Sequence, residues 1–235
     1  YPLLYPVDGW VEVDPNKLLE SVYDTLDPML DSSFDIVCAG ITNQRETTLV
    51  WDSVSGEPIY NGIVWQDRRT ADYCSSLKEQ NLEPIINKKT GLLLDPYFSA
   101  TKISWILDNV EGARKKAMKG DLRFGTVDTY LLWHLSGGQL HKTDVTNASR
   151  TNIFNIHSME WDQELLNIFD IPASILPEVC SSDAEFGLLS RKGSTIPITS
   201  MIGDQQSALV GQECFNYGDM KATFGTGCFL MVNSG

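Results

Sequence analysis

The sequence predicts an α/β fold in which a mixed sheet is flanked by helices, and two observations support that class. Short runs of β-branched and apolar residues, bounded by turn residues, alternate along the chain with helical patterns. In those helical patterns apolar residues recur at three- and four-residue spacing, as expected for helices that pack one face on a sheet. At 235 residues the chain is long enough for one large domain or two small ones.

The first helix is expected over residues 14–30, where leucines and valines recur with helical spacing after Asp14-Pro15, an N-cap and first-turn pair. Strands are expected next at 34–41, 47–52 and 59–65, the last two joined by a turn and suggesting a hairpin at a sheet edge. The remaining expected helices are 67–77, 99–109, 112–119, 128–135, 162–169 and 205–211. The remaining expected strands are 123–127, 196–202, 221–224 and 229–233.

Composition excludes several classes of partner. A formal net charge of −13 argues against nucleic acid and anionic membranes, because binding to phosphates needs clustered lysine and arginine. No apolar run approaches the roughly 18 residues of a membrane span. The five cysteines are scattered without a CxxC pair or a histidine cluster, so we expect reduced thiols, a cytoplasmic location and no metal site made by this chain.

A polar cluster, Asn43-Gln44-Arg45-Glu46, follows an apolar strand pattern abruptly. Arg45 can donate several hydrogen bonds and Glu46 can accept them, so the pair can grip adjacent hydroxyl groups of a polyol. The alternative is a solvated turn that holds an ordinary ion pair.

A second cluster, Gly203-Asp204-Gln205-Gln206, stands where a β-branched run gives way to a helix. A carboxylate in that place can take a proton from an attacking hydroxyl group, while Gln205 orients the same substrate. The alternative makes Asp204 a helix N-cap.

Near the C-terminus, Gly225-Thr226-Gly227 joins two expected strands, and its glycines would let backbone N–H groups approach phosphate oxygens. An ordinary hairpin turn gives nearly the same pattern. Two aromatic residues, Trp65 and Tyr97, flank expected strand and helix ends and can wall a small pocket, although core packing would also account for each.

Residues 97–109, Tyr-Phe-Ser-Ala-Thr-Lys-Ile-Ser-Trp-Ile-Leu-Asp-Asn, match the first signature of the FGGY family of carbohydrate kinases, and the chain resembles that family over nearly its whole length. Within the family, four segments resemble the kinases that act on glycerol: residues 40–48, 64–70, 143–151 and 224–229. The resemblance implies the actin-like ATPase fold, built from ribonuclease H-like domains.

The resemblance also implies a reaction, the transfer of a phosphoryl group from MgATP to a terminal hydroxyl of glycerol, in an enzyme expected to be a homo-oligomer. Asp204 would be the general base, and the nucleotide phosphates would be contacted by Gly225, Thr226 and Gly227. The residues implied to bind glycerol are Arg45, Glu46, Tyr97, Asp204 and Gln205, with Trp65 and Phe229 packed on its carbon backbone.

By the same resemblance, residues 1–235 are expected to be the N-terminal, substrate-binding domain without its first strands and phosphate loop. The first residue is not Met, and an ATP-binding domain is not recognisable after the last expected strand. We therefore expect a fragment that is inactive by itself. Two alternatives stay open: a kinase of this family for xylulose or gluconate, and a non-catalytic protein that retains the fold.

Overall fold

The computed structural model describes residues 1–225 and 227–235. The helices are α1 (Pro15–Leu30), α2 (Ala71–Glu79), α3 (Glu83–Thr90), α4 (Ser99–Asn109), α5 (Ala113–Lys119), α6 (Val127–Leu135), α7 (Val145–Ala148), α8 (Gln163–Ile168), α9 (Asp204–Gly211) and the 3-10 turn η1 (Ala173–Ile175). The strands are β1 (Leu3–Leu4), β2 (Glu12–Val13), β3 (Ala39–Asn43), β4 (Leu49–Asp52), β5 (Gly62–Ile63), β6 (Leu122–Gly125), β7 (Lys142–Asp144), β8 (Phe154–Asn155), β9 (Glu160–Trp161), β10 (Glu178–Cys180), β11 (Gly187–Arg191), β12 (Ser194–Gly203), β13 (Met220–Phe224) and β14 (Cys228–Val232).

The sheet that positions the candidate site has the order β11-β12-β3. Its long middle strand, β12, pairs in parallel with β3 and antiparallel with β11. In the parallel pair Gly203 lies opposite Asn43, so both strands end at the same edge. The segments that follow them, Gln44–Glu46 and α9, therefore begin side by side.

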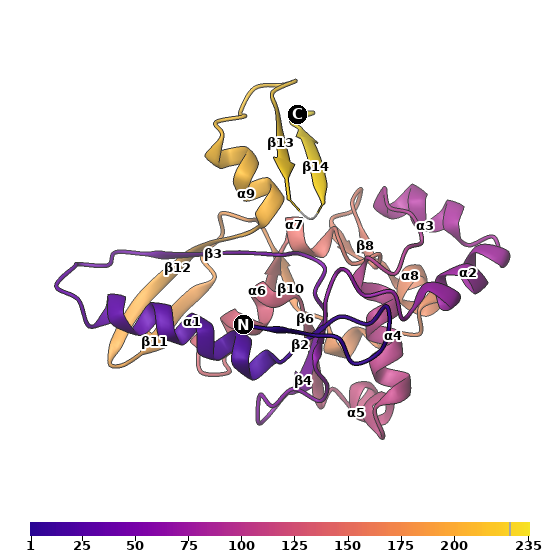
Figure 1. Ribbon diagram of the computed structural model, residues 1–235, viewed down its shortest axis with the longest axis horizontal. Helices are drawn as coiled ribbons and strands as arrows, with labels where there is room; N and C mark the ends of the chain where they lie inside the picture. Colours follow the sequence, from indigo (N-terminus) through magenta and orange to yellow (C-terminus); the bar gives the residue numbers. More distant parts are fainter. Residues whose placement is uncertain (226) are drawn as a thin grey trace.

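The other strand pairs are short and of both kinds, which confirms the mixed α/β class. Parallel pairing joins β7 to β10, whereas β4 and β6 pair antiparallel, as do β8 and β9. Strands β1, β2 and β5 form a third antiparallel group. The hairpin β13–β14 stands beside α9 and projects from the rest of the molecule (Figure 1).

Strand β4 separates two apolar clusters because its side chains alternate between faces. Leu49 and Trp51 belong to the cluster that includes buried residues of α1 and α6. Val50 points the other way, into the cluster that includes α4 and α5. Trp51 is fully buried and packs edge-to-face on Tyr130, with ring centroids 5.3 Å apart. These clusters hold the strand ends in fixed positions.

Several predicted elements are confirmed closely. Asp14 caps α1 by accepting the backbone N–H groups of Asn16 and Lys17, and α4 has the predicted bounds. The predicted strand at 34–41 is wrong in its first half, since β3 begins at Ala39 and extends to Asn43. Phe34 and Val37 are 72% and 73% exposed, so their apolar character does not reflect burial in a sheet.

Two further expectations are corrected. The helix expected from residue 67 begins at Ala71, because Asp67 is buried and receives hydrogen bonds from Arg69 and from the backbone N–H of Val11. The strand after residue 47 pairs with β6, and only the isolated bridges Thr48–Ile63 and Trp51–Pro58 remain of the expected hairpin. Within the described residues, no helix combines the length and apolarity needed to cross a membrane.

Candidate active site

A small polar cavity of about 110 Å³ lies where the ends of β3 and β12 meet. Its walls come from well-separated parts of the chain: Gln44, Arg45, Glu46, Trp65, Tyr97, Asp204, Gln205 and Phe229. The structure therefore brings together all the residues that the sequence analysis expected to contact a substrate. The cavity is well below the roughly 300–1,000 Å³ of sites for drug-sized ligands, so it suits a small polar molecule.

Arg45 is buried and faces two carboxylates. Its Nε lies 3.5 Å from Asp204 Oδ1, and its Nη2 lies 3.8 Å from Glu46 Oε1. Its Nη1 donates to Gln206 Oε1 at 3.2 Å. The buried Nε has no hydrogen-bond partner among the described residues, and such donors are rare in folded proteins. The guanidinium is therefore no solvated turn residue, because it is buried beside two carboxylates.

Gly203 explains how Arg45 fits so closely beneath α9. A Cβ at this position would lie 2.5 Å from Arg45 Cδ, closer than nonbonded carbon atoms approach. The backbone N–H of Gly203 donates to Thr146 Oγ1 at 2.7 Å, which fixes the end of β12. Gly203, and not Asp204, is the N-cap of α9, so the N-cap interpretation of Asp204 is wrong.

Glu46 is held by an arginine that the sequence analysis did not single out. Arg150 Nε donates to Glu46 Oε1 at 2.7 Å. The guanidinium carbon of Arg150 also lies 4.9 Å from the ring centroid of Phe98 and 5.7 Å from that of Tyr97. Arg150 thus fixes Glu46 against the aromatic wall. Its only sequence signal was its place in the segment 143–151.

Trp65 and Tyr97 form the aromatic wall, with ring centroids 5.7 Å apart and an interplanar angle of 60°. Burial, and next the charge of Glu46, raise the pKa of the Tyr97 hydroxyl to about 12. At neutral pH the phenol is therefore protonated and can donate a hydrogen bond.

Lys102 joins the two segments that carry Glu46 and Tyr97. Its side chain is fully buried in α4, and Nζ donates to the backbone carbonyl oxygens of Tyr97 at 2.7 Å and Glu46 at 3.0 Å. Burial lowers the pKa of Lys102 to about 7, against an opposing effect of nearby carboxylates led by Glu46. This residue lies within the signature segment 97–109, but its contacts were not predicted.

Asp204 and Gln205 open α9 at the opposite wall of the cavity. The backbone N–H of Gln205 donates to Asp204 Oδ1 at 2.7 Å, and Gln205 Nε2 lies 3.4 Å from Asp204 Oδ2. The Asp204 side chain is 45% exposed, so its carboxylate is accessible to a molecule in the cavity. Lys221 of β13 donates to Gln205 Oε1 at 2.6 Å.

A buried polar network supports the end of β3 and includes side chains of α6, α7 and β7. Asn43 Nδ2 donates to Asp128 Oδ1 at 3.2 Å and to Asn147 Oδ1 at 2.9 Å. Thr143 donates to the other oxygen of Asp128 at 2.8 Å, and Asp144 caps α7. Burial raises the pKa of the Asp128 carboxyl to about 6. Asn43 is therefore held by partners on α6 and α7, which residues of β7 hold in turn.

Phe229 closes the cavity from the hairpin β13–β14. Its ring lies so close to the turn that a Cβ on Gly227 would be 2.8 Å from the ring carbon Cε2. The Gly225 backbone N–H donates to the carbonyl of Gly227 at 3.0 Å. Thr226, expected to contact phosphates, lies outside the described residues.

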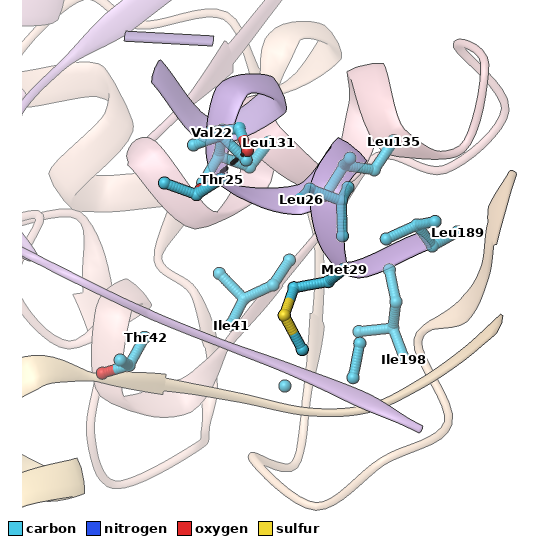
Figure 2. A pocket seen from close by; sticks show the side chains of 12 residues that line it. Val22, Thr25, Leu26, Met29, Ile41, Thr42, Leu131, Leu135, Leu189 and Ile198 are labelled. Carbon is cyan, nitrogen blue, oxygen red and sulfur yellow. Dashed lines mark hydrogen bonds between the residues drawn. The ribbon is translucent and has the colours of Figure 1, made fainter. Parts of the chain in front are cut away.

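A larger hollow of about 390 Å³ lies elsewhere, between α1 and β3 (Figure 2). Its lining is mostly aliphatic, including Val22, Leu26, Ile41, Leu131 and Ile198. It has no ionisable side chain in its walls, so it offers no acid, base or charge for a reaction. Among the described residues, no group of three or more His, Cys, Asp or Glu side chains is placed to hold a metal ion.

Comparison with known proteins assigns the family. Residues 1–211 match the model of the N-terminal domain of the FGGY family of carbohydrate kinases. The chain belongs to this family. Two curated relatives are the glycerol kinase of Alteromonas mediterranea, 59% identical, and glycerol kinase 1 of Pseudomonas aeruginosa, 57% identical. Each match covers 98% of this chain and 48% of the relative, so the chain spans about half the length of these relatives.

Solved structures of FGGY kinases share the fold. The crystal structure of Plasmodium falciparum glycerol kinase with ADP matches with a TM-score of 0.92 and 39% identity, over 99% of this chain and 48% of that one. Gluconate kinase from Lactobacillus acidophilus matches with a TM-score of 0.85 at 21% identity, over 98% of this chain and 47% of that one. The predicted actin-like ATPase fold of this FGGY chain is thus confirmed.

Proposed function

We propose that this chain is the substrate-binding domain of an ATP-dependent glycerol kinase. The single observation that carries the proposal is the small cavity in which Arg45, Glu46, Asp204 and Gln205 converge between aromatic walls. Its charged donors and acceptors suit adjacent hydroxyl groups, and its rings suit the carbon atoms between them. The 57–59% identity to two glycerol kinases supports the same substrate.

In the proposed reaction each wall has its own task. Arg45 and Glu46 bind two hydroxyl groups of glycerol and orient the third toward Asp204. Asp204 Oδ1 accepts the Gln205 backbone N–H at 2.7 Å, whereas the contact of Oδ2 with Gln205 Nε2 is longer, 3.4 Å, so Oδ2 is the oxygen better placed to accept the proton of the attacking hydroxyl. The deprotonated oxygen attacks the γ-phosphorus of ATP, the bond to ADP breaks, and the product is sn-glycerol 3-phosphate. Positioning and electrostatics supply most of the acceleration.

The nucleotide is proposed to lie across the cavity mouth, beside the turn at Gly225 and Gly227, with Thr226 donating to its phosphates. ADP in the Plasmodium falciparum relative supports nucleotide binding in this family. Mg²⁺ would reach the site with ATP, held chiefly by phosphate oxygens and few carboxylates, and would neutralise charge on the transferred group. Residues 1–235 are accordingly proposed as the N-terminal domain of a cytoplasmic enzyme.

Cavity size distinguishes glycerol from the larger sugars of the family. Xylulose and gluconate carry more carbon atoms, and Trp65 and Phe229 would have to move apart to admit them. The test is ATP-dependent phosphorylation of glycerol, xylulose and gluconate by the complete protein that carries this chain. We expect turnover of glycerol with the highest kcat/KM. Preference for either larger sugar, or turnover of none, would contradict the proposal.

Replacement of the proposed base gives a sharper test. The Asp204→Asn variant keeps the size of the side chain but loses the proton acceptor, so kcat should fall by about 10²–10⁴-fold. Glycerol affinity, measured by calorimetry, should change little because Arg45 and Glu46 remain. Turnover close to that of the wild type would remove the general-base assignment. A loss of binding without a loss of kcat would make Asp204 a binding residue only.

A further inference from the structure

Lys221 is a buried lysine behind the wall of the cavity. It belongs to β13, is 8% exposed, and donates from Nζ to Gln205 Oε1 and to Thr223 Oγ1, each at 2.6 Å. Neither the sequence motifs nor the proposed reaction uses this lysine. It does not line the cavity, whereas its partner Gln205 does.

The lysine determines which end of the Gln205 amide faces the cavity. An ammonium group has three donors and no acceptor, so the amide atom 2.6 Å from it has to be the oxygen. The nitrogen of the amide is then on the other side, and Nε2 lies 3.4 Å from Asp204 Oδ2. Without Lys221, the amide could rotate and present its oxygen to the Asp204 carboxylate, which would be repulsive.

We infer that Lys221 is a positioning residue, which holds the Gln205 amide as a hydrogen-bond donor toward Asp204 and the substrate. Lys221 donates to the Gln205 amide oxygen, and the Gln205 amide nitrogen donates to Asp204 Oδ2, so the chain of hydrogen bonds ends on the proposed base. The chain fixes Asp204 Oδ2 from behind, while the Gln205 backbone N–H fixes Oδ1. This inference rests on the proposed function, since it gives Gln205 a single hydrogen-bonding role in the same site.

A buried lysine can also serve only to attach β13 to α9. A double-mutant cycle tests whether Lys221 acts through Gln205, and Gln205→Glu, which keeps that attachment, separates it from orientation of the amide. Lys221→Met should lower kcat/KM by about 10- to 100-fold, mainly through kcat, because a hydrogen bond involving a charged group is lost. Gln205→Ala should lower it by a similar factor. If Lys221 acts through Gln205, the double variant should be no worse than Gln205→Ala within about twofold. If the loss of kcat/KM in the double variant equals the product of the two single losses, the inference is overturned.

Two further variants keep the test decisive if Lys221→Met does not fold. Lys221→Arg retains donors to Gln205 and should recover most of the lost kcat. Gln205→Glu retains the contact with Lys221 as a charge pair. It removes the side-chain donor Nε2, keeps the backbone N–H, and adds a like charge beside Asp204. It should fold, yet turn over no faster than Gln205→Ala. Turnover of Gln205→Glu at the wild-type rate would overturn the donor role.

Lys89→Met is the matched control. Lys89 is another lysine with short polar contacts, in its case to carboxylates, 2.7 Å to Asp162 and 2.7 Å to Glu164, and it lines no part of the cavity. It should lower the melting temperature without changing kcat/KM. The cycle is run with whichever of glycerol, xylulose and gluconate the wild type phosphorylates. If the wild type prefers a larger sugar, only the proposed function is contradicted. If the two single losses in kcat/KM multiply in the double variant, only the role of Lys221 is contradicted.

Discussion

Gly203 shows how one residue sets the width of the candidate site. Its missing Cβ leaves the space that Arg45 Cγ and Cδ occupy, at 2.6 and 2.5 Å from the position a Cβ would take. Gly203→Ala should therefore push the guanidinium toward the cavity, raise KM for glycerol about 10-fold and destabilise the fold by about 1–3 kcal/mol. Steady-state kinetics and chemical denaturation measure the two effects.

Gly211 supplies the control for that substitution. It is in the same helix, α9, and a Cβ there would meet nothing within 4 Å. Gly211→Ala should leave KM unchanged. Equal effects of the two substitutions would mean that contact with Arg45 is not the cause.

Lys102 should make stability depend on pH in a definite direction. Its pKa is about 7 in the fold and about 10.4 in an unfolded chain, so the unfolded chain binds more protons between those values. The free energy of unfolding of the wild type should therefore rise, relative to that of Lys102→Met, as pH increases from about 7 toward 10. Below pH 7 the penalty for the buried charge is present in full.

Thermal unfolding of wild type and Lys102→Met at pH 6.5 and pH 9 tests this expectation, because titration of other groups is shared by both proteins. The melting temperature of the wild type minus that of Lys102→Met should be more positive at pH 9 than at pH 6.5. A difference independent of pH would mean that Lys102 keeps an ordinary pKa. Kinetics of the same variant should show a raised KM, since the segments bearing Glu46 and Tyr97 lose their common anchor.

At the scale of elements, periodicity predicted helices well and strands less well. Capping by Asp14 and the spacing of apolar residues locate α1, since both are local properties of the sequence. Strand β3 was misplaced because strand pairing is not local: its bounds are set by β12, more than 150 positions away in the sequence. The helix α3 was missed although Pro84 stands in its first turn and Gly91 ends it in the left-handed conformation.

The same distinction explains what was predictable of the site. Polar motifs at strand ends identified Arg45, Glu46, Asp204 and Gln205, and the structure places them around one cavity. Their supporting residues were not predictable in this way. Arg150 contacts Glu46 across 104 positions of the sequence, and Lys102 reaches the Glu46 carbonyl across 56. Single lysines and arginines carry no local pattern that reveals such partners.

At the scale of the whole molecule, the cavity lies where parts of the chain that are far apart in the sequence meet. Its walls include the ends of β3 and β12, the segment before α4 and the projecting hairpin β13–β14 (Figure 1). A ligand that contacts all of these walls would bind the folded chain only. Ligand binding should therefore stabilise the fold as a whole, and not one element alone.

Glycerol at about 100 times its dissociation constant should add about 2.7 kcal/mol to the free energy of unfolding, which corresponds to roughly 5–10 °C in melting temperature. Polyols also stabilise proteins without a site, because they are excluded from the surface. Arg45→Ala is the control, since it removes the central cation of the cavity but is stabilised by excluded polyol as the wild type is. A saturable shift in the wild type, absent from Arg45→Ala, is the expected result of thermal-shift titration. Equal, unsaturating shifts in both proteins would mean that the cavity does not bind glycerol.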